Sequence, residues 1–376
     1  MKNRMFYLDV LRCLAILLVV YCHFVSVGSG WNKIPDVIKI SDSVTMPLLK
    51  ANVLTHFDTF LKNHFSTCAG TLGVCLFFLM SGFLVPIMME RHNRFTFFVN
   101  RIVRIFPVMW VCLAISGLFI FLTNGITFSV GDYLSNMFLI KTTIGGSMRW
   151  MLPMEVIFYF VAVIIGKFDL KKALISVLSI MLFMAYVAYV VFGGSYDLYN
   201  RHPILHHICF ILQFIPIIFI GTSIYISKQY KNILAKIICV SFFTSLAYLS
   251  LSLSCQYFDL GTNILTYGNL GTYLIILGLW YVVYFIFEFG KVKLGSVLEN
   301  IIEWVSKTGY PIYLLHLAIG LTLIEKIRFI FTNNYLILTV ALFFALLVSR
   351  LVYLYVEVPV ISVGKRLKKT CEDQKK

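Results

Sequence analysis

The sequence carries little charge, because only 13% of its 376 residues are Asp, Glu, Lys or Arg. An average soluble domain has about twice that share, so an ordinary soluble enzyme is excluded. The chain also has only nine prolines beside 34 phenylalanines and 21 tyrosines, which excludes a disordered or collagen-like protein. With 60% hydrophobic residues, the class that remains is a polytopic membrane protein.

The nine cysteines show no C-x-x-C spacing and are odd in number, which argues against a disulfide framework or a zinc site. Most lie in apolar runs, where we expect small buried hydrophobic side chains. His202, His206 and His207 include an i, i+4 pair, but no nearby cysteine or carboxylate completes a ligand set. We therefore predict that the protein binds no metal.

Ten apolar runs approach the roughly 20 residues that a helix needs to cross a bilayer. They cover residues 8–27, 70–89, 102–122, 150–166, 173–192, 204–226, 233–253, 265–287, 309–330 and 335–358. The sequence therefore predicts an all-α fold, a single bundle of about ten transmembrane helices. We expect one integral membrane domain over residues 1–360 and a short basic tail over residues 361–376.

The net charge of +15 could suggest binding of nucleic acid, but the chain has no soluble basic face that could bind it. Lys and Arg instead gather near the N-terminus, around 91–104, 167–172 and 228–236, and in the C-terminal tail, whereas the alternate connections are poor in basic residues. Basic residues remain on the cytoplasmic side of membrane proteins. Both termini are therefore predicted to be cytoplasmic, with the long outer segment 29–69 as a cap over the acceptor side.

The first apolar run contains three ionisable residues, Asp9, Arg12 and His23. Arg12 and His23 are eleven residues apart, so they share one helix face and lie roughly 16 Å apart along the axis. In one interpretation, Asp9 and Arg12 form an interfacial ion pair and His23 is a neutral core histidine. In the other, Arg12 anchors an anionic ligand from the cytoplasm and His23 is a base at the far end of the same channel.

Arg101 and Arg104 begin the third predicted span on the cytoplasmic side. Arginines at i and i+3 present two forked donors on one face, which suits phosphate. Arginines at this place are also the ordinary topology signal and a contact for anionic lipid. The residues alone leave both interpretations open.

Two further spans contain polar side chains that need a partner or a cavity. Glu155 lies about one turn after Trp150, where it could orient a histidine, hold a sugar hydroxyl or pair with an arginine. In the ninth span, Tyr313 lies three residues before His316 and on the same face. A single intramembrane histidine is more often a packing residue than a catalytic one.

Five motifs, in order along nearly the whole chain, resemble acyltransferase family 3, the integral membrane acyltransferases that acylate sugars of bacterial surface polysaccharides. Arg12 and His23 match the R-x10-H signature of that family. The other four motifs are the glycine-rich segment 70–84 with Ser81, the arginine motif 101–107, the W-x-L-x-x-E of 150–155 and the closing E-x-P of 357–359. Many members have an acidic pair after the tryptophan motif, whereas here Val156 follows Glu155.

The resemblance implies transfer of an acyl group, usually acetyl from cytoplasmic acetyl-CoA, to a sugar hydroxyl. It implies His23, Arg12 and Glu155 as catalytic residues, with His23 as general base or transient acyl carrier. Arg101 and Arg104, together with Arg12, would bind donor phosphates. Ser81 would allow close helix packing beside His23 or donate to the thioester oxygen.

Trp150, Tyr313 and His316 would support the acceptor. The expected partners are acyl-CoA as co-substrate, a lipid-linked or surface glycan and membrane lipids, with no bound cofactor and no nucleic acid. The expected location is the bacterial cytoplasmic membrane.

Three alternatives keep the same residues. Intramembrane Arg, His and Glu also serve transporters, so the protein could move a lipid-linked glycan or small acid without chemistry. The donor could be succinyl-CoA or another acyl-CoA. A purely structural subunit of polysaccharide assembly would tolerate the substitution His23→Ala.

Overall fold

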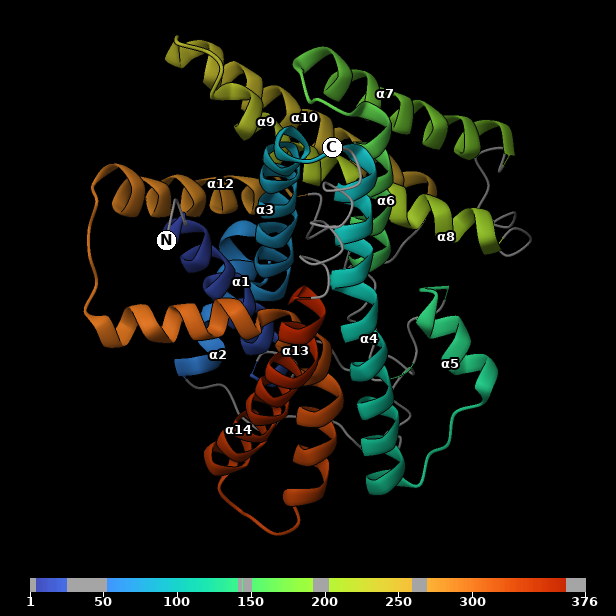
Figure 1. Cartoon of the computed structure of the whole chain (residues 1–376), viewed down its shortest axis with the longest axis vertical. Coiled ribbons are helices and arrows are strands. Elements are labelled where there is room, and N and C mark those ends of the chain that lie inside the picture. The colour runs from blue at the N-terminus through green and yellow to red at the C-terminus, as the bar shows by residue number, and fades with distance from the viewer. Residues whose placement is uncertain are drawn as a thin grey trace, which may run out of the picture. The chain divides into compact units, whose positions relative to one another are not determined.

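The computed structural model describes residues 5–25, 53–140, 144, 151–191, 203–258 and 269–362 of the chain. Within these ranges the regular structure is entirely helical (Figure 1). The helices are α1 (Phe6–Phe24), α2 (Val53–Phe65), α3 (Ala69–Arg91), α4 (Arg94–Asn124), α5 (Val130–Met137), α6 (Met151–Ile165), α7 (Leu170–Tyr186), α8 (Pro203–Leu212), α9 (Ile215–Ser227), α10 (Ile233–Phe258), α12 (Leu270–Tyr284), α13 (Ser296–Ile327) and α14 (Asn334–Val352). Three π-helical turns continue α7, α12 and α14, namely η3 (Val187–Val191), η5 (Phe285–Phe289) and η6 (Tyr353–Glu357).

Among the described residues, nine helical segments are long and apolar enough to cross a membrane. They are Phe6–Phe24, Ala69–Arg91, Arg94–Asn124, Leu170–Val191, Ile208–Ser227, Ile233–Ser252, Leu270–Phe289, Ser296–Ile327 and Asn334–Ser362. The all-α, polytopic membrane architecture predicted from the sequence is thus confirmed. The fourth predicted span, 150–166, is not among these nine: it contains the apolar helix α6, which has 15 residues and is shorter than the usual length of a span.

The chain forms two compact units, and each contains segments that are far apart in sequence. Unit 1 comprises Met1–Phe60, Val99–Leu152 and Ile286–Lys376. Unit 2 comprises Leu61–Phe98 and Pro153–Phe285. The last fourteen residues of the predicted tail, 363–376, lie outside the described part of the chain.

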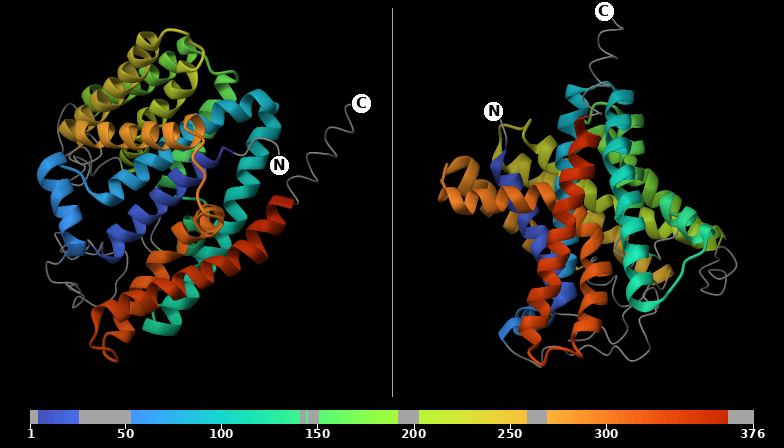
Figure 2. Two further views of the ribbon diagram at one scale, coloured as in Figure 1. Left: turned by 90° about the vertical axis from the view of Figure 1, so that its left-hand side faces the viewer. Right: turned by 60° about the horizontal axis from the view of Figure 1, so that its bottom comes forward.

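In unit 1, α13 is the central helix and packs against both α1 and α14. Figure 2 shows α13 and α14 side by side in both views, joined by a short turn. Two glycines of α13 let α1 approach closely: a Cβ at Gly309 would lie 2.3 Å from Ile16 Cδ1, and one at Gly320 would lie 2.1 Å from the Phe24 ring. Larger residues at these positions would push α1 away from α13.

In unit 2, α3 and α9 make the tightest contact, backbone against backbone. A Cβ at Gly82 would lie 1.8 Å from the Ile218 carbonyl oxygen, and one at Gly221 would lie 2.0 Å from that of Leu79. The Thr222 hydroxyl donates a hydrogen bond of 3.0 Å to the Gly82 carbonyl across the same contact. Gly82 therefore admits α9 at close range. The close packing beside His23 that the sequence suggested for this segment stays a prediction.

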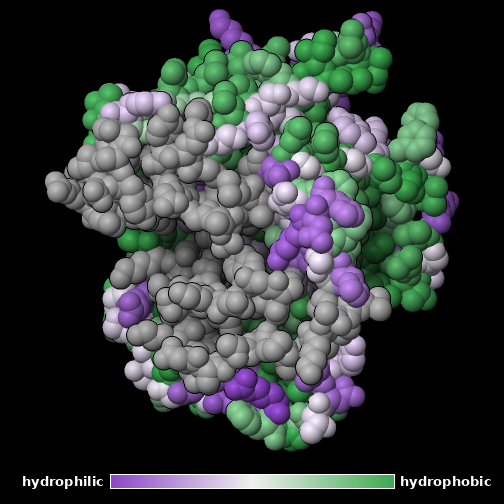
Figure 3. Space-filling view, turned by 180° about the vertical axis from the view of Figure 1, so that it is seen from behind, coloured by the Kyte–Doolittle hydropathy of each residue, from purple (hydrophilic) through white to green (hydrophobic). Residues whose placement is uncertain are grey.

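The spans differ in how much of their surface is inside the protein. In the most apolar stretch of each span, 83% is buried inside the protein for Ser296–Ile327 and for Ile208–Ser227, but only 22% for Leu170–Val191. Figure 3 shows wide hydrophobic areas on one face of the described surface. Because apolar side chains are stable in lipid, we assign the weakly buried helices to the bilayer contact and the strongly buried ones to the interior.

We predict that Gly82→Ala and Gly221→Ala each destabilise the protein by about 1–3 kcal/mol, because the added methyl meets a backbone carbonyl that cannot move aside. Gly278→Ala is the matched control, since a Cβ there meets nothing within 4 Å. The measurement is the melting temperature of the purified variants in detergent. Equal melting temperatures for Gly82→Ala and Gly278→Ala would contradict the tight α3–α9 contact.

Candidate active site

The first helix places the polar residues of unit 1 at two levels. Asp9 and Arg12 lie in its first two turns, and His23 lies in its last turn. Asp9 and His23 are both buried, and the Arg12 side chain is about one third exposed. At 1.5 Å per residue, the helix separates Arg12 from His23 by roughly 16 Å along its axis, as the spacing predicted.

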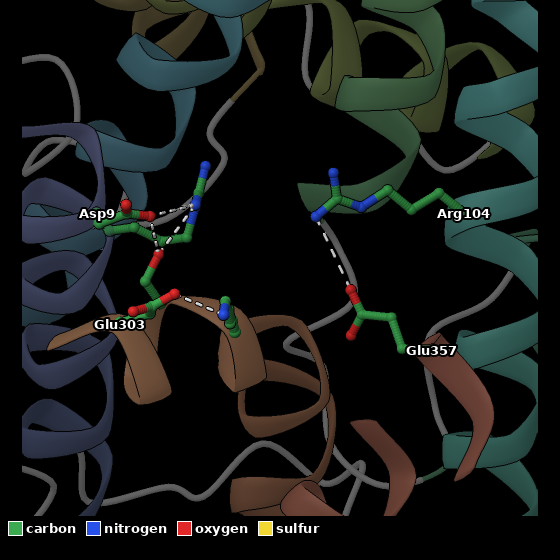
Figure 4. A network of polar contacts seen from close by, with 7 residues as sticks. Asp9, Arg104, Glu303 and Glu357 are labelled. Carbon is green, nitrogen blue, oxygen red and sulfur yellow. Dashed lines mark hydrogen bonds and ion pairs between the residues drawn. The ribbon is translucent and has the colours of Figure 1, made fainter. Parts of the chain in front are cut away.

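At the first level, Ser306 of α13 links Asp9 with Arg12. The Ser306 hydroxyl donates to Asp9 Oδ1 at 2.6 Å, and Arg12 Nη1 donates to Ser306 Oγ at 3.0 Å. Arg12 Nη1 also lies 3.4 Å from Asp9 Oδ1. The ion pair considered from the sequence is therefore present, and a serine 294 residues away in the chain completes it (Figure 4).

At the second level, His23 meets His316 of α13. His23 Nδ1 lies 3.0 Å from His316 Nε2, and both rings are buried. His316 Nδ1 lies 2.9 Å from the carbonyl oxygen of Ile312, one turn earlier. Because Asp9 meets Ser306 and His23 meets His316, α1 and α13 run in the same direction, as a first and a ninth span would.

The geometry determines where the protons lie when both rings are neutral. A carbonyl oxygen only accepts, so His316 Nδ1 must carry the proton that is donated to Ile312. His316 Nε2 then has a lone pair, and His23 Nδ1 must be its donor. The proton-free nitrogen of the pair is therefore His23 Nε2, which can act as a base or a nucleophile.

Aromatic rings surround the histidine pair. The Tyr313 ring lies 6.3 Å from that of His316 between centroids, and the Phe24 ring stacks on His316 at 6.5 Å. Both aromatic side chains are buried. They restrict the orientation of the His316 ring and shield it from water, which strengthens its hydrogen bonds.

A second charged group in unit 1 joins α4 to the C-terminal helix. Arg104 Nη2 lies 3.8 Å from Glu357 Oε1, and the carboxylate of Glu357 is almost completely buried (Figure 4). Arg101 is half-buried and has interactions of its own within the protein. Phosphate binding by either arginine remains a prediction, as does the role of Arg12 as an anion anchor.

In unit 2, Glu155 of α6 accepts two hydrogen bonds. The Ser81 hydroxyl donates to its Oε1 at 2.8 Å, and the Tyr159 hydroxyl donates to its Oε2 at 3.2 Å. The proton of Ser81 is used by this contact, so a bond to a thioester oxygen would require Glu155 to release it. The structure brings Ser81 and Glu155 together; their predicted catalytic and donor-binding roles remain predictions.

Some predicted residues cannot be compared with the structure. Trp150 and His202 lie outside the described residues, as do the side chains of His206 and His207. Among the described residues, no three His, Cys, Asp or Glu side chains gather in a way that could hold a metal ion.

Sequence reasoning missed the specific partners: Ser306 for Arg12, His316 for His23 and Tyr159 for Glu155. The sequence does contain one signal for the first two of these partners, Ser306 and His316. Ser306 and His316 are ten residues apart in α13, nearly the spacing of Arg12 and His23 in α1. Two parallel helices with polar residues at matching heights are a recognisable pattern once the helices are known to be neighbours.

We predict that both histidines of the pair carry their neutral-state proton on Nδ1. The measurement is nitrogen NMR of the protein labelled at histidine, with the two signals assigned through His23→Gln and His316→Gln. His23 Nε2 should show the chemical shift of an unprotonated ring nitrogen. A proton on Nε2 of neutral His23 would contradict the deduced hydrogen-bond direction.

The comparisons with known proteins identify the family of the chain. A profile of the family described as an acyltransferase domain matches residues 5–354. No curated protein and no solved structure matches the chain. Because the matched segment covers nearly the whole sequence and contains both levels of polar residues on α1, the chain is a membrane acyltransferase and belongs to acyltransferase family 3.

Proposed function

We propose that the protein transfers an acyl group, acetyl in the first instance, from cytoplasmic acyl-CoA to a hydroxyl of a lipid-linked or surface polysaccharide sugar. The reaction converts a thioester and an alcohol into an ester and free coenzyme A. The proposed location is the bacterial cytoplasmic membrane. No bound cofactor is required, because the thioester is already activated.

The observation that carries the proposal is the buried pair His23–His316 with its proton-free Nε2. His23 Nε2 takes the proton of the acceptor hydroxyl while the oxygen attacks the thioester carbon. The resulting imidazolium is stabilised through its Nδ1–H bond to His316, whose own proton is held by Ile312. The proton then passes to the departing thiolate, so that coenzyme A leaves as the thiol.

The same nitrogen would serve a covalent route. In that case Nε2 attacks the thioester carbon and coenzyme A leaves as the thiolate. The acceptor hydroxyl then attacks the acyl carbon, the neutral imidazole is released, and the hydroxyl proton neutralises the thiolate through solvent. The two routes differ in one measurable respect. Only the covalent route leaves label on the protein when acetyl-CoA is supplied without acceptor.

The arrangement of charge in unit 1 suits acyl-CoA, whose phosphates and thioester lie at opposite ends of a long molecule. Arg12 and Arg104 are candidates for the anionic phosphates of coenzyme A. His23 lies roughly 16 Å from Arg12 along α1, where the long pantetheine arm would deliver the thioester. Tyr313 and Phe24 keep this end apolar, which excludes water and so limits hydrolysis of the thioester.

We predict that His23→Ala removes nearly all transfer of label from acetyl-CoA into lipid-linked or surface glycan, a loss of about 100- to 10,000-fold. The assay uses membranes with matched abundance of native and variant protein. His56→Ala, which removes an exposed histidine of α2, is the control and should remain active. Repeating the assay with succinyl-CoA tests the identity of the acyl group.

Two outcomes would contradict the proposal. Full transfer by His23→Ala would remove this histidine from the reaction. If label were absent even with the native chain while glycan crossed the bilayer only in its presence, the protein would be a transporter.

We also predict that His316→Ala lowers kcat by roughly 10- to 100-fold with little change in KM for acetyl-CoA. The physical reason is that the variant loses a hydrogen bond to a histidine that becomes charged, worth about 1.5–3 kcal/mol. His316 acts on the reaction only through His23. A double variant should therefore be no slower than His23→Ala alone, and a further large loss would show an independent role of His316.

A further inference from the structure

Glu357 is the buried acidic partner of Arg104 in the ion pair that joins α4 to the π-helical turn after α14. Its carboxylate is 1% exposed, and its Oε2 has no hydrogen-bond partner. Figure 4 shows the Arg104 side chain extending from α4 toward this carboxylate. The charge of Arg12 also acts on this carboxylate, although Arg104 is the arginine with which it forms an ion pair. A buried carboxylate with a single ion pair at 3.8 Å is costly, so its presence calls for a physical reason.

The local backbone explains how Glu357 reaches this place. It ends the π-helical turn η6, in which the Val358 N–H bonds to the Tyr353 carbonyl, five residues earlier. Pro359 follows two residues later and has no N–H for the regular helical bond, so a wider turn before it relieves its clash with the preceding carbonyl. The spacing E-x-P therefore has a structural meaning: the proline shapes the turn that orients the glutamate.

Arg104 is the cation that this carboxylate contacts. The Arg104 side chain is 50% exposed, and Glu357 is its only ion-pair or hydrogen-bond partner within the described ranges. The contact involves one nitrogen, Nη2, so most of the five N–H donors of the guanidinium stay available. Arg104 thus contacts Glu357 through one nitrogen, while half of its side chain is exposed.

Two other arginines of unit 1 use their N–H donors in hydrogen bonds to side chains within the protein. Arg12 is held by Asp9 and Ser306, and Arg350 donates to the Thr308 hydroxyl at 3.3 Å. Arg350 also lies over the Tyr353 ring at 5.0 Å. Arg104 therefore keeps more of its donors available to an outside anion than Arg12 or Arg350 does.

We propose that Glu357 is a positioning residue for the acyl donor: it holds the guanidinium of Arg104 with its free N–H groups turned toward a phosphate of coenzyme A. Fixing a long side chain in advance removes part of the entropy cost of binding. The nature of the ligand rests on the proposed function. The alternative is that the carboxylate competes with the phosphate for Arg104. This holds if the repulsion between Glu357 and the phosphate exceeds the gain from fixing the Arg104 side chain.

The test compares Glu357→Gln, Arg104→Gln and the double variant. We expect Glu357→Gln to raise both Kd for coenzyme A and KM for acetyl-CoA about five-fold, with kcat within about two-fold of native. Arg104→Gln should raise both at least as much. The double variant should bind no more weakly than Arg104→Gln, because the proposed effect of Glu357 is exerted through Arg104 and not through Arg12, whose charge also acts on the carboxylate.

Two controls separate positioning from folding. Glu303→Gln removes a carboxylate that pairs with Lys307 on α13 and should leave Kd unchanged. Glu357→Asp keeps the charge but withdraws it from Arg104, so it should weaken binding even if the glutamine variant folds poorly. Arg104 is half-exposed, so Arg104→Gln provides a folded variant in either case.

Several results would overturn the inference: unchanged or tighter binding of coenzyme A by Glu357→Gln, unchanged binding by Arg104→Gln, or losses that add in the double variant. Tighter binding would identify the carboxylate as a competitor. Because binding of coenzyme A is measured directly, the inference can fail while transfer of label succeeds. Conversely, Glu357-dependent binding without any transfer would contradict the proposed function and leave the positioning role standing.

Discussion

The structure depends on one constraint: an ionisable side chain within a membrane-spanning helix needs a partner or a wet cavity, because hydrocarbon offers it no hydrogen bonds. In unit 1, α13 supplies the partners for α1. Ser306 meets Asp9 and Arg12 at one level, and His316 meets His23 at the other. The two contacts fix the parallel register of the helices and, in doing so, set the hydrogen-bond direction that leaves His23 Nε2 unprotonated. The pairs that stabilise the helix contact are thus also the ones to which the proposed function assigns the chemistry.

Small residues make these contacts possible. Gly309 and Gly320 let α13 approach Ile16 and Phe24 of α1, and Gly82 and Gly221 bring α3 against α9 in unit 2. Between helices in lipid there is little hydrophobic driving force, so close packing and polar contacts supply the cohesion. The glycines set the distance at which a ring nitrogen of α1 can bond to one of α13.

Much of the fold could be predicted from the sequence because hydrophobic length and helical periodicity are local properties. The spans followed from apolar runs, and the shared face of Arg12 and His23 followed from their spacing. The pairing of His23 with His316 could not, since it depends on which helices are neighbours, and the ninth-span histidine resembled an ordinary packing residue. Glu357 matched a motif, but its role required the π-turn before Pro359, a departure from regular helix that periodicity does not encode. The fourth predicted span, 150–166, contains the helix Met151–Ile165, whose 15 residues fall short of the usual length of a span.

The central claim is that acyl transfer takes place beside His23 Nε2, which acts as the base or as the transient acyl carrier. The most direct measurement is an experimental structure of the full chain with a non-reactive acetyl-CoA analogue bound. The account predicts the thioester carbon within about 6 Å of His23 Nε2, close enough for direct attack or for reaction through one intervening hydroxyl. A bound analogue whose acyl group lies far from His23, or is enclosed by unit 2 alone, would contradict it.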